Sequence, residues 1–190
     1  AGDTYGSLDG HTRLGFSDAF VMKFSSSGVW QWTRTEGVAS SFLGAAGFGV
    51  AVSTEEDVYV AVQFVPFFSG NWEAMLLKYN ANGDLLGSDL RASDTSSYEA
   101  RSVAVGKNGD EVYVSGSIRG DANSNGGSDA LLMRFDSAGV WQNDTQRGGV
   151  GNDVVFGVAV SSTGYIYVAG TTLSSTFDGG SSSGSCRTYG

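Results

Sequence analysis

The sequence predicts an all-β protein assembled from a repeated four-stranded unit. Two segments, "DAFVMKFSSSGVWQW" from Asp18 and "DALLMRFDSAGVWQN" from Asp129, are closely similar, and a looser copy, "EAMLLKYNANGDLLG", begins at Glu73. Recurrence after 55 and then 56 residues indicates stacked supersecondary units. The 29 Gly residues, the single Pro and the many Val and Tyr residues favour short strands joined by tight turns. No segment shows the apolar spacing of an amphipathic helix.

Each unit contains four strand-like pieces separated by turn residues. In the first unit they are "AFVMKF" from Ala19, "VWQWT" from Val29, "FGVAV" from Phe48 and "VYVAV" from Val58. In the second they are "AMLLKY" from Ala74, the weaker "DLLGS" from Asp84, "RSVAV" from Arg101 and "VYVSG" from Val112. In the third they are "ALLMRF" from Ala130, "VWQND" from Val140, "FGVAV" from Phe156 and "IYVAG" from Ile166.

Glycines mark the turns between the first two strands of each unit. Gly28, Gly83 and Gly139 each follow small residues or Asn, and glycine supplies the positive φ that such turns require. The third and fourth strands are nearly continuous apolar runs, which predicts sheets covered on both faces. Repeated four-stranded antiparallel sheets stack either as a solenoid or radially, as the blades of a propeller.

The pieces "SDAFVMKFSSSGVWQW", "GFGVAV" and "DVYVA" together resemble the β-propeller repeat that occurs in tandem in large secreted and cell-surface proteins of bacteria, algae and protists. The resemblance implies a partial propeller of about three four-stranded blades. The expected segments are the end of a preceding blade in 1–15, blades in 16–64, 65–120 and 121–172, and a Ser/Gly-rich tail or the start of a next blade in 173–190. The segment "VQFVPFFSGNWEA" departs from the usual Gly/Ser/Asp-rich connection.

Three blades cannot close a ring when propellers typically contain four to eight. The opening "AGDTYGSLDG" matches the residues that follow "YIYV" near the end of the chain. We therefore expect either a piece of a longer chain or a protomer that completes its ring with another copy, because open sheet edges invite strand pairing.

Charge excludes two classes of partner. With 11 Lys and Arg against 20 Asp and Glu, the formal charge is −9, which repels nucleic acid and anionic lipid surfaces. No apolar run is long enough to insert into a membrane. We expect partners to be other copies, the remainder of a longer chain, or extracellular matrix and surface proteins, with glycans as a further candidate.

The segment "DANSNGGSD" carries the sharpest binding motif. Its spacing, D-x-N-x-N-G-x-x-D, is typical of calcium loops, which take oxygen ligands, and resembles loops between the strands of integrin-type propellers. The candidate ligands are Asp121, Asn123, Asn125, Gly127 and Asp129. The alternative is that Asp129, which has counterparts in Asp18 and Glu73, anchors the blade by bonding backbone groups.

Three further residues are candidates for contacts or modification. Trp72 has no repeat counterpart, so it is either a platform for a sugar or partner, or an aromatic plug at a nonstandard junction. Asn143 begins "NDT", an N-glycosylation acceptor. Cys186 is the only cysteine and is either a free thiol or a bridge to another chain.

No catalytic residues are predicted. His11 is the only histidine, and no motif places a nucleophile beside a base. The sequence therefore favours a non-catalytic, extracellular or cell-surface scaffold with structural or adhesive function. A carbohydrate-binding propeller module is the alternative, and a glycoside hydrolase using two acids from distant loops is the third.

Overall fold

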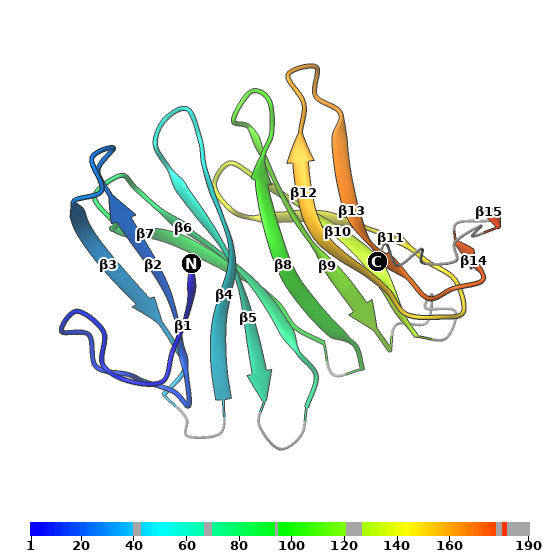
Figure 1. The fold of residues 1–190 in the computed structure, drawn as a ribbon, viewed down its shortest axis with the longest axis horizontal. Coiled ribbons are helices and arrows are strands. Elements are labelled where there is room, and N and C mark those ends of the chain that lie inside the picture. Colours follow the sequence, from blue (N-terminus) through cyan, green and yellow to red (C-terminus); the bar gives the residue numbers. More distant parts are fainter. Residues whose placement is uncertain (40–42, 67–69, 94, 121–126, 178–179, 182–190) are drawn as a thin grey trace, which may run out of the picture.

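The computed structural model describes residues 1–39, 43–66, 70–93, 95–120, 127–177 and 180–181, and these residues form strands joined by turns (Figure 1). No helix occurs within these ranges, and each named strand pairs with its neighbours in antiparallel orientation. The all-β prediction is confirmed.

Two complete four-stranded sheets occupy the middle of the chain. The first contains β4 (Leu43–Val52), β5 (Val58–Pro66), β6 (Glu73–Tyr79) and β7 (Leu85–Arg91) in that order. The second contains β8 (Ser97–Val105), β9 (Glu111–Arg119), β10 (Ser128–Asp136) and β11 (Trp141–Arg147) in that order. Strand β7 begins inside the weaker pattern "DLLGS", so the predicted second strand of the second unit is present.

Smaller sheets lie at the two ends. The N-terminal sheet contains β1 (Gly2–Thr4), β2 (Asp18–Phe24) and β3 (Trp30–Glu36). The C-terminal sheet contains only β12 (Asp153–Val160) and β13 (Ile166–Thr172), and it is followed by the short pair β14 (Thr176–Phe177) and β15 (Gly180–Ser181).

The sheets do not coincide with the expected units 16–64, 65–120 and 121–172. Each four-stranded sheet joins the third and fourth strands of one unit to the first and second strands of the next. Strand β5 pairs with β6, for example, although the expected boundary between units falls between them. The sheet frame is therefore shifted by two strands from the expected one.

The predicted glycine turns are present. Gly28, Gly83 and Gly139 have φ of 81°, 80° and 86°, in the left-handed region that favours glycine. The amide of each glycine donates to the carbonyl three residues earlier at 2.9 Å. These turns close the hairpins β2–β3, β6–β7 and β10–β11.

Apolar side chains from facing sheets form two core clusters, one on each face of the sheet β4–β7. The cluster toward the N-terminal sheet contains Ala19, Val21, Ala45, Val58, Val60, Val62, Phe64, Leu77 and Tyr79. The cluster toward the sheet β8–β11 contains Tyr59, Ala61, Ala74, Leu76, Ala100, Val103, Val112, Val114, Ile118, Leu131, Met133 and Phe135. Neighbouring residues of β5 thus point into different clusters, and the prediction of sheets covered on both faces is confirmed for β4–β7.

The first strands of successive sheets lie next to one another. Strand β8 contacts both β4 and β12, and it lies between them in Figure 1. The approach of β4 to β8 is close at Gly49, where an added Cβ would stand 2.8 Å from the amide nitrogen of Val103. The molecule is therefore a row of sheets packed face to face, with β13 at one end and β2 near the other.

Candidate functional site: an open sheet edge

The same strand pattern occurs in three different surroundings. The last residue of "VYV" or "IYV" is 1% exposed at Val60 and at Val114 but 50% exposed at Val168. Strands β5 and β9 each have hydrogen-bonded neighbours on both sides, whereas β13 pairs only with β12 within the described part of the chain. In the described structure, β13 therefore combines an unpaired backbone edge with exposed apolar side chains.

An apolar pocket of about 370 Å³ lies beside this edge. Strands β10 and β11 form one wall, with Leu132 and Thr145 among its residues, and β12 and β13 contribute Val154 and Val168 to the other. A pocket bordered by the unpaired edge of a strand and by apolar side chains is suited to receive another strand.

The opposite end of the molecule has a second incomplete edge. Strand β1 pairs with β2 only at Asp18, Ala19 and Phe20, so the edge of β2 is unpaired from Val21 to Phe24 among the described strands. Phe20 and Met22 are half-buried, and Phe24 is 52% exposed. At the two ends of the molecule, β13 and part of β2 thus lack a hydrogen-bonded neighbour that their counterparts have within the four-stranded sheets.

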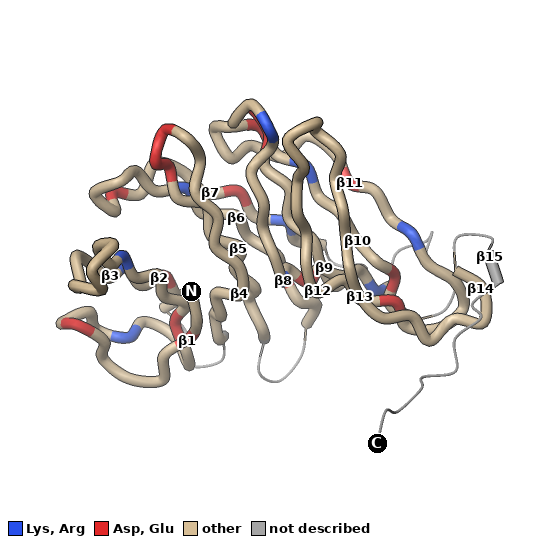
Figure 2. Tube along the Cα trace, turned by 45° about the horizontal axis from the view of Figure 1, so that its top comes forward, with Lys and Arg blue, Asp and Glu red and all other residues tan. Residues whose placement is uncertain are grey.

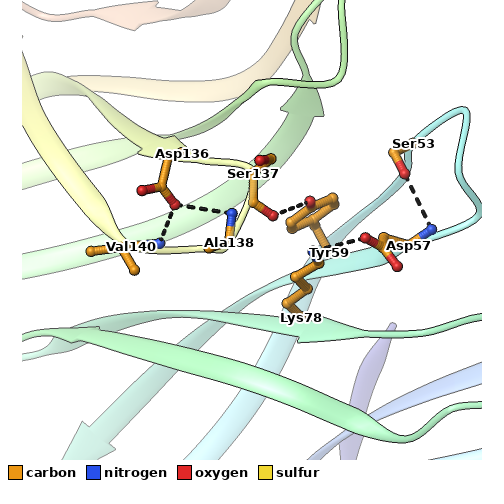
Figure 3. A network of polar contacts seen from close by, with 8 residues as sticks. All are labelled: Ser53, Asp57, Tyr59, Lys78, Asp136, Ser137, Ala138 and Val140. Atoms are coloured by element: carbon orange, nitrogen blue, oxygen red, sulfur yellow. Dashed lines mark hydrogen bonds and ion pairs between the residues drawn. The ribbon is translucent and has the colours of Figure 1, made fainter.

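Polar contacts join each sheet to the hairpin of the next. The Tyr59 hydroxyl of β5 donates to the carbonyl of Ser137, in the β10–β11 hairpin, at 2.6 Å (Figure 3). Lys23 of β2 donates in the same way to the carbonyl of Ala81, in the β6–β7 hairpin, at 2.9 Å. The direction of these contacts, from one sheet to the next hairpin along the chain, is the same at both interfaces.

The recurring basic residues of the first strand have partners. Lys78 forms an ion pair with Asp57 at 2.8 Å beside the Tyr59 ring, and Arg134 pairs with Glu111. Lys78 and Arg134 thus link neighbouring strands through ion pairs. Burial alone would lower the pKa of Lys78, but its hydrogen bond to Asp57 raises the pKa overall.

A tyrosine lies beside each of these ion pairs: Tyr59 beside Lys78 and Asp57, and Tyr113 beside Glu111 and Arg134. Tyr113 donates a hydrogen bond to Glu111. Burial, followed by the Glu111 carboxylate, raises the pKa of Tyr113 to about 12. The hydrogen bond from Tyr113 in turn lowers the pKa of Glu111. Partial burial of Glu111 acts in the opposite direction, and Arg134 lowers the pKa further. The tyrosine hydroxyls therefore stay protonated and act as donors at neutral pH.

Most of the predicted calcium loop, including Asp121, Asn123 and Asn125, lies outside the described residues. Gly127 and Asp129 are described, and Asp129 is buried at the start of β10. No group of three or more His, Cys, Asp or Glu residues suited to a metal occurs in the part of the chain that the structure describes.

Asp18 shows what this repeat position does elsewhere. Its two carboxylate oxygens accept hydrogen bonds from the amides of Leu14 at 2.7 Å and Gly15 at 2.8 Å. The anchoring role that the sequence suggested is therefore present at Asp18. Asp153, which lies near Asp129, was not among the predicted residues because the corresponding positions in the other sheets are Ala45 and Tyr98.

The other candidate residues are dispersed. Trp72 is 36% exposed, and its backbone bonds to the start of β8 through Ser97 and Tyr98. Asn143 is exposed on the edge strand β11. Cys186 lies outside the described residues. The structure does not bring Trp72 and Asn143 into one site.

Charged residues are distributed over all the sheets (Figure 2). Basic and acidic residues alternate with neutral ones along the described chain, and Lys and Arg do not gather on one sheet. No helix long and apolar enough to cross a membrane was found among the described residues.

No protein-family model matches the chain. The regulatory protein FlaEY of Caulobacter vibrioides is 32% identical over 135 residues, which make up 65% of this chain. The chain spans only 14% of the length of that protein.

Proposed function

We propose that this chain is a non-catalytic structural module of a propeller-type repeat assembly, and that its open β13 edge receives strand β2 of a second copy. The single observation that carries the proposal is the exposure of β13, whose counterparts β5 and β9 are buried between two neighbours. Strand addition would bury the apolar residues of β13 and satisfy the unpaired backbone groups of its edge.

The register of β1 supports the choice of β2 as the incoming strand. Strand β1 places Gly2 opposite Phe20, and β9 places Gly116 opposite Leu131. Phe20 and Leu131 occupy the same position of the repeat, and Gly170 of β13 corresponds to Gly116. Strand β13 would therefore replace the short β1 and set Gly170 opposite Phe20 of the second copy.

The side chains of β2 match the pocket beside β13. In the sheet β8–β11, the residues that correspond to Phe20, Met22 and Phe24 are buried against β6, and they are Leu131, Met133 and Phe135. The same packing would direct the three side chains of the second copy toward the wall formed by Leu132, and so into the apolar pocket.

The hairpin contacts support the same geometry. Tyr113 is the counterpart of Tyr59, whose hydroxyl donates to the hairpin of the following sheet. The β2–β3 hairpin of an incoming copy, around Ser26, would stand where β13 now lacks a neighbour, and would present its carbonyls to the sheet that contains Tyr113.

The wider role rests on the resemblance of the repeat and on the relative that it matches. The matched segment is 14% of the length of FlaEY, so similar sequence also occurs as a small part of a longer protein. Rigid sheets and open edges suit a structural or adhesive scaffold at the cell surface or outside the cell, with matrix or surface proteins as further partners.

Size-exclusion chromatography with light scattering tests the self-association. We expect the parent chain to elute as an oligomer above 19.7 kDa, and Val168→Glu to be monomeric, because a carboxylate would have to be buried at the new interface. Leu85→Glu is the matched control, since Leu85 is 48% exposed on a sheet that already has neighbours on both faces.

A folded parent that stays monomeric over the whole concentration range contradicts the proposal. So does a Val168→Glu variant that associates as the parent does. Circular dichroism of both variants establishes that any change in mass does not come from unfolding.

A carbohydrate-binding role is the second candidate. A hollow of about 490 Å³ is lined by Tyr98 and Trp141 together with polar groups such as Asn143 and Asp144. Against this role, the Arg91 guanidinium lies 4.0 Å from the Trp141 ring and covers one of its faces. A glycan array on the parent, Trp72→Ala and Trp141→Ala would support this candidate if binding were found and then lost in either variant.

A further inference from the structure

Two buried carboxylates converge at the end of the last two sheets. Asp129 at the start of β10 is 2% exposed, and Asp153 at the start of β12 is fully buried at 0%. A Cβ added to Gly148 would stand 2.3 Å from Asp129 Oδ1 and 2.8 Å from Asp153 Oδ2. Both side chains therefore reach the same small space, which glycine leaves open.

Neither carboxylate is fully satisfied by the described residues. Asp129 Oδ2 accepts a hydrogen bond from the Gln146 amide at 2.7 Å, and Asp153 Oδ2 accepts from the Gly149 amide and the Ser174 hydroxyl, each at 2.8 Å. The Oδ1 atoms of both residues are buried and have no hydrogen-bond partner in the described structure. No described Lys, Arg or His forms an ion pair with either residue.

The repeat does not account for this arrangement. Asp18 occupies the same repeat position as Asp129, and Gly37 stands to Asp18 as Gly148 stands to Asp129. Both oxygens of Asp18, however, accept backbone hydrogen bonds. The counterparts of the two Asp18 donors, residues 125 and 126, lie outside the described residues, but the second acid, Asp153, is specific to this end of the molecule.

Two adjacent buried carboxylates are costly without a compensating charge. Burial removes them from water, and their mutual repulsion is stronger in a low-dielectric interior than at the surface. Buried polar atoms without partners are rare in folded proteins, and an unoccupied ion position is one established reason for them. One divalent cation would balance the two formal charges and supply a partner for the free Oδ1 of Asp129, which borders the space beside Gly148.

We propose that a hard divalent cation of the calcium type binds between Asp129 and Asp153. The donors are all oxygen atoms, which calcium prefers, and no sulfur or imidazole group among the described residues favours a transition metal here. Through Asp153, bound calcium would fix the segment that begins at Gly149, and would clamp the start of β12 to the start of β10. This site is independent of the proposed self-association.

Calorimetric titration with calcium tests the site. We expect the parent chain to bind calcium, and Asp129→Asn and Asp153→Asn each to weaken binding at least tenfold, because each removes half of the balancing charge. Asp18→Asn is the matched control and keeps the parent affinity, since it lies at the equivalent position of another sheet. Terbium luminescence, excited through the tryptophans, measures binding by a second signal in any variant whose stability is low.

Three results would overturn the inference. The first is a folded parent that binds neither calcium nor terbium. The second is unchanged affinity in Asp129→Asn and Asp153→Asn. The third is loss of binding in Asp121→Ala alone, which would assign the cation to the preceding loop and not to the buried pair.

Discussion

Gly116 illustrates how one residue decides whether a strand can pack. It lies in the middle of β9, and a Cβ added there would stand 1.9 Å from the carbonyl oxygen of Glu99. Strand β8 is irregular opposite this point, with a register shift between Ala100 and Ser102. The glycine makes room for the bulged backbone of β8, which in turn directs the side chains of β8 into the core.

Replacing Gly116 by Ala is expected to lower the free energy of unfolding. The added methyl group collides with backbone and not with a movable side chain, so we expect a loss of about 1–3 kcal/mol, the usual cost of overpacking. Urea unfolding followed by fluorescence measures the loss. Gly87→Ala is the control, because the nearest atom to its added Cβ is the Ala138 carbonyl oxygen at an ordinary 3.6 Å. Equal stability of the two variants would contradict the steric explanation.

Single residues differ in how far the sequence predicts them. The positive φ at Gly28 could be predicted because a turn needs it whatever the surroundings. The loop-anchoring role of Asp18 was one of two readings, because its hydrogen bonds come from neighbours in the chain. Asp153 could not be predicted, since its place beside Asp129 depends on how two sheets pack and nothing in the repeat marks it.

At the scale of the element, strands were predicted well and their grouping was not. Each strand pattern carries its own periodicity and turn signals, so even the weak strand β7 could be located. Which strands share a sheet depends on the longer connections, 37–42 and 67–72, which lack the regular turn pattern found at Gly28, Gly83 and Gly139. Strand β5 pairs with β6 across the second of these, whereas β3 and β4 lie in different sheets. Because the sequence is periodic, it does not show whether a sheet begins with the first or with the third strand of a repeat unit.

The cluster of Tyr113, Glu111 and Arg134 links two strands of one sheet and predicts a pH dependence. The pKa of Tyr113 is raised from 10.0 to about 12, so the folded state favours the neutral phenol. The stabilisation is complete below pH 10 and is lost as the pH rises from about 10 to 12. Chemical unfolding across this range should show a steeper fall in stability for the parent than for Tyr113→Phe.

The exposed Tyr165 provides the control for this measurement. Tyr165→Phe should keep the pH profile of the parent, because Tyr165 takes no part in the cluster of Tyr113, Glu111 and Arg134. A Tyr113→Phe variant that loses stability as steeply as the parent above pH 10 would contradict the role given to the Tyr113 hydroxyl.

At the scale of the whole molecule, the proposed pairing of β2 from one copy with β13 of another predicts that stability depends on protein concentration. A partner that binds only the folded state raises the melting temperature by mass action. We expect the melting temperature of the parent to rise between 1 and 100 µM, and that of Val168→Glu to stay constant. A parent whose melting temperature is independent of concentration would contradict the proposed pairing of β2 with β13, since a monomer has no association step to couple to unfolding.

The approach of β4 to β8 at Gly49 has a consequence for how such an assembly would end. Because the backbones of β4 and β8 nearly touch there, the two four-stranded sheets are in close contact at this edge. The curvature of the row then depends on how far apart the sheets stand at their other edges, β7 and β11. Joining unlike edges head to tail is an open-ended operation unless the accumulated turn returns to its starting point. The bend per sheet, more than the strength of any one contact, would therefore decide between a closed ring and a fibre of unlimited length.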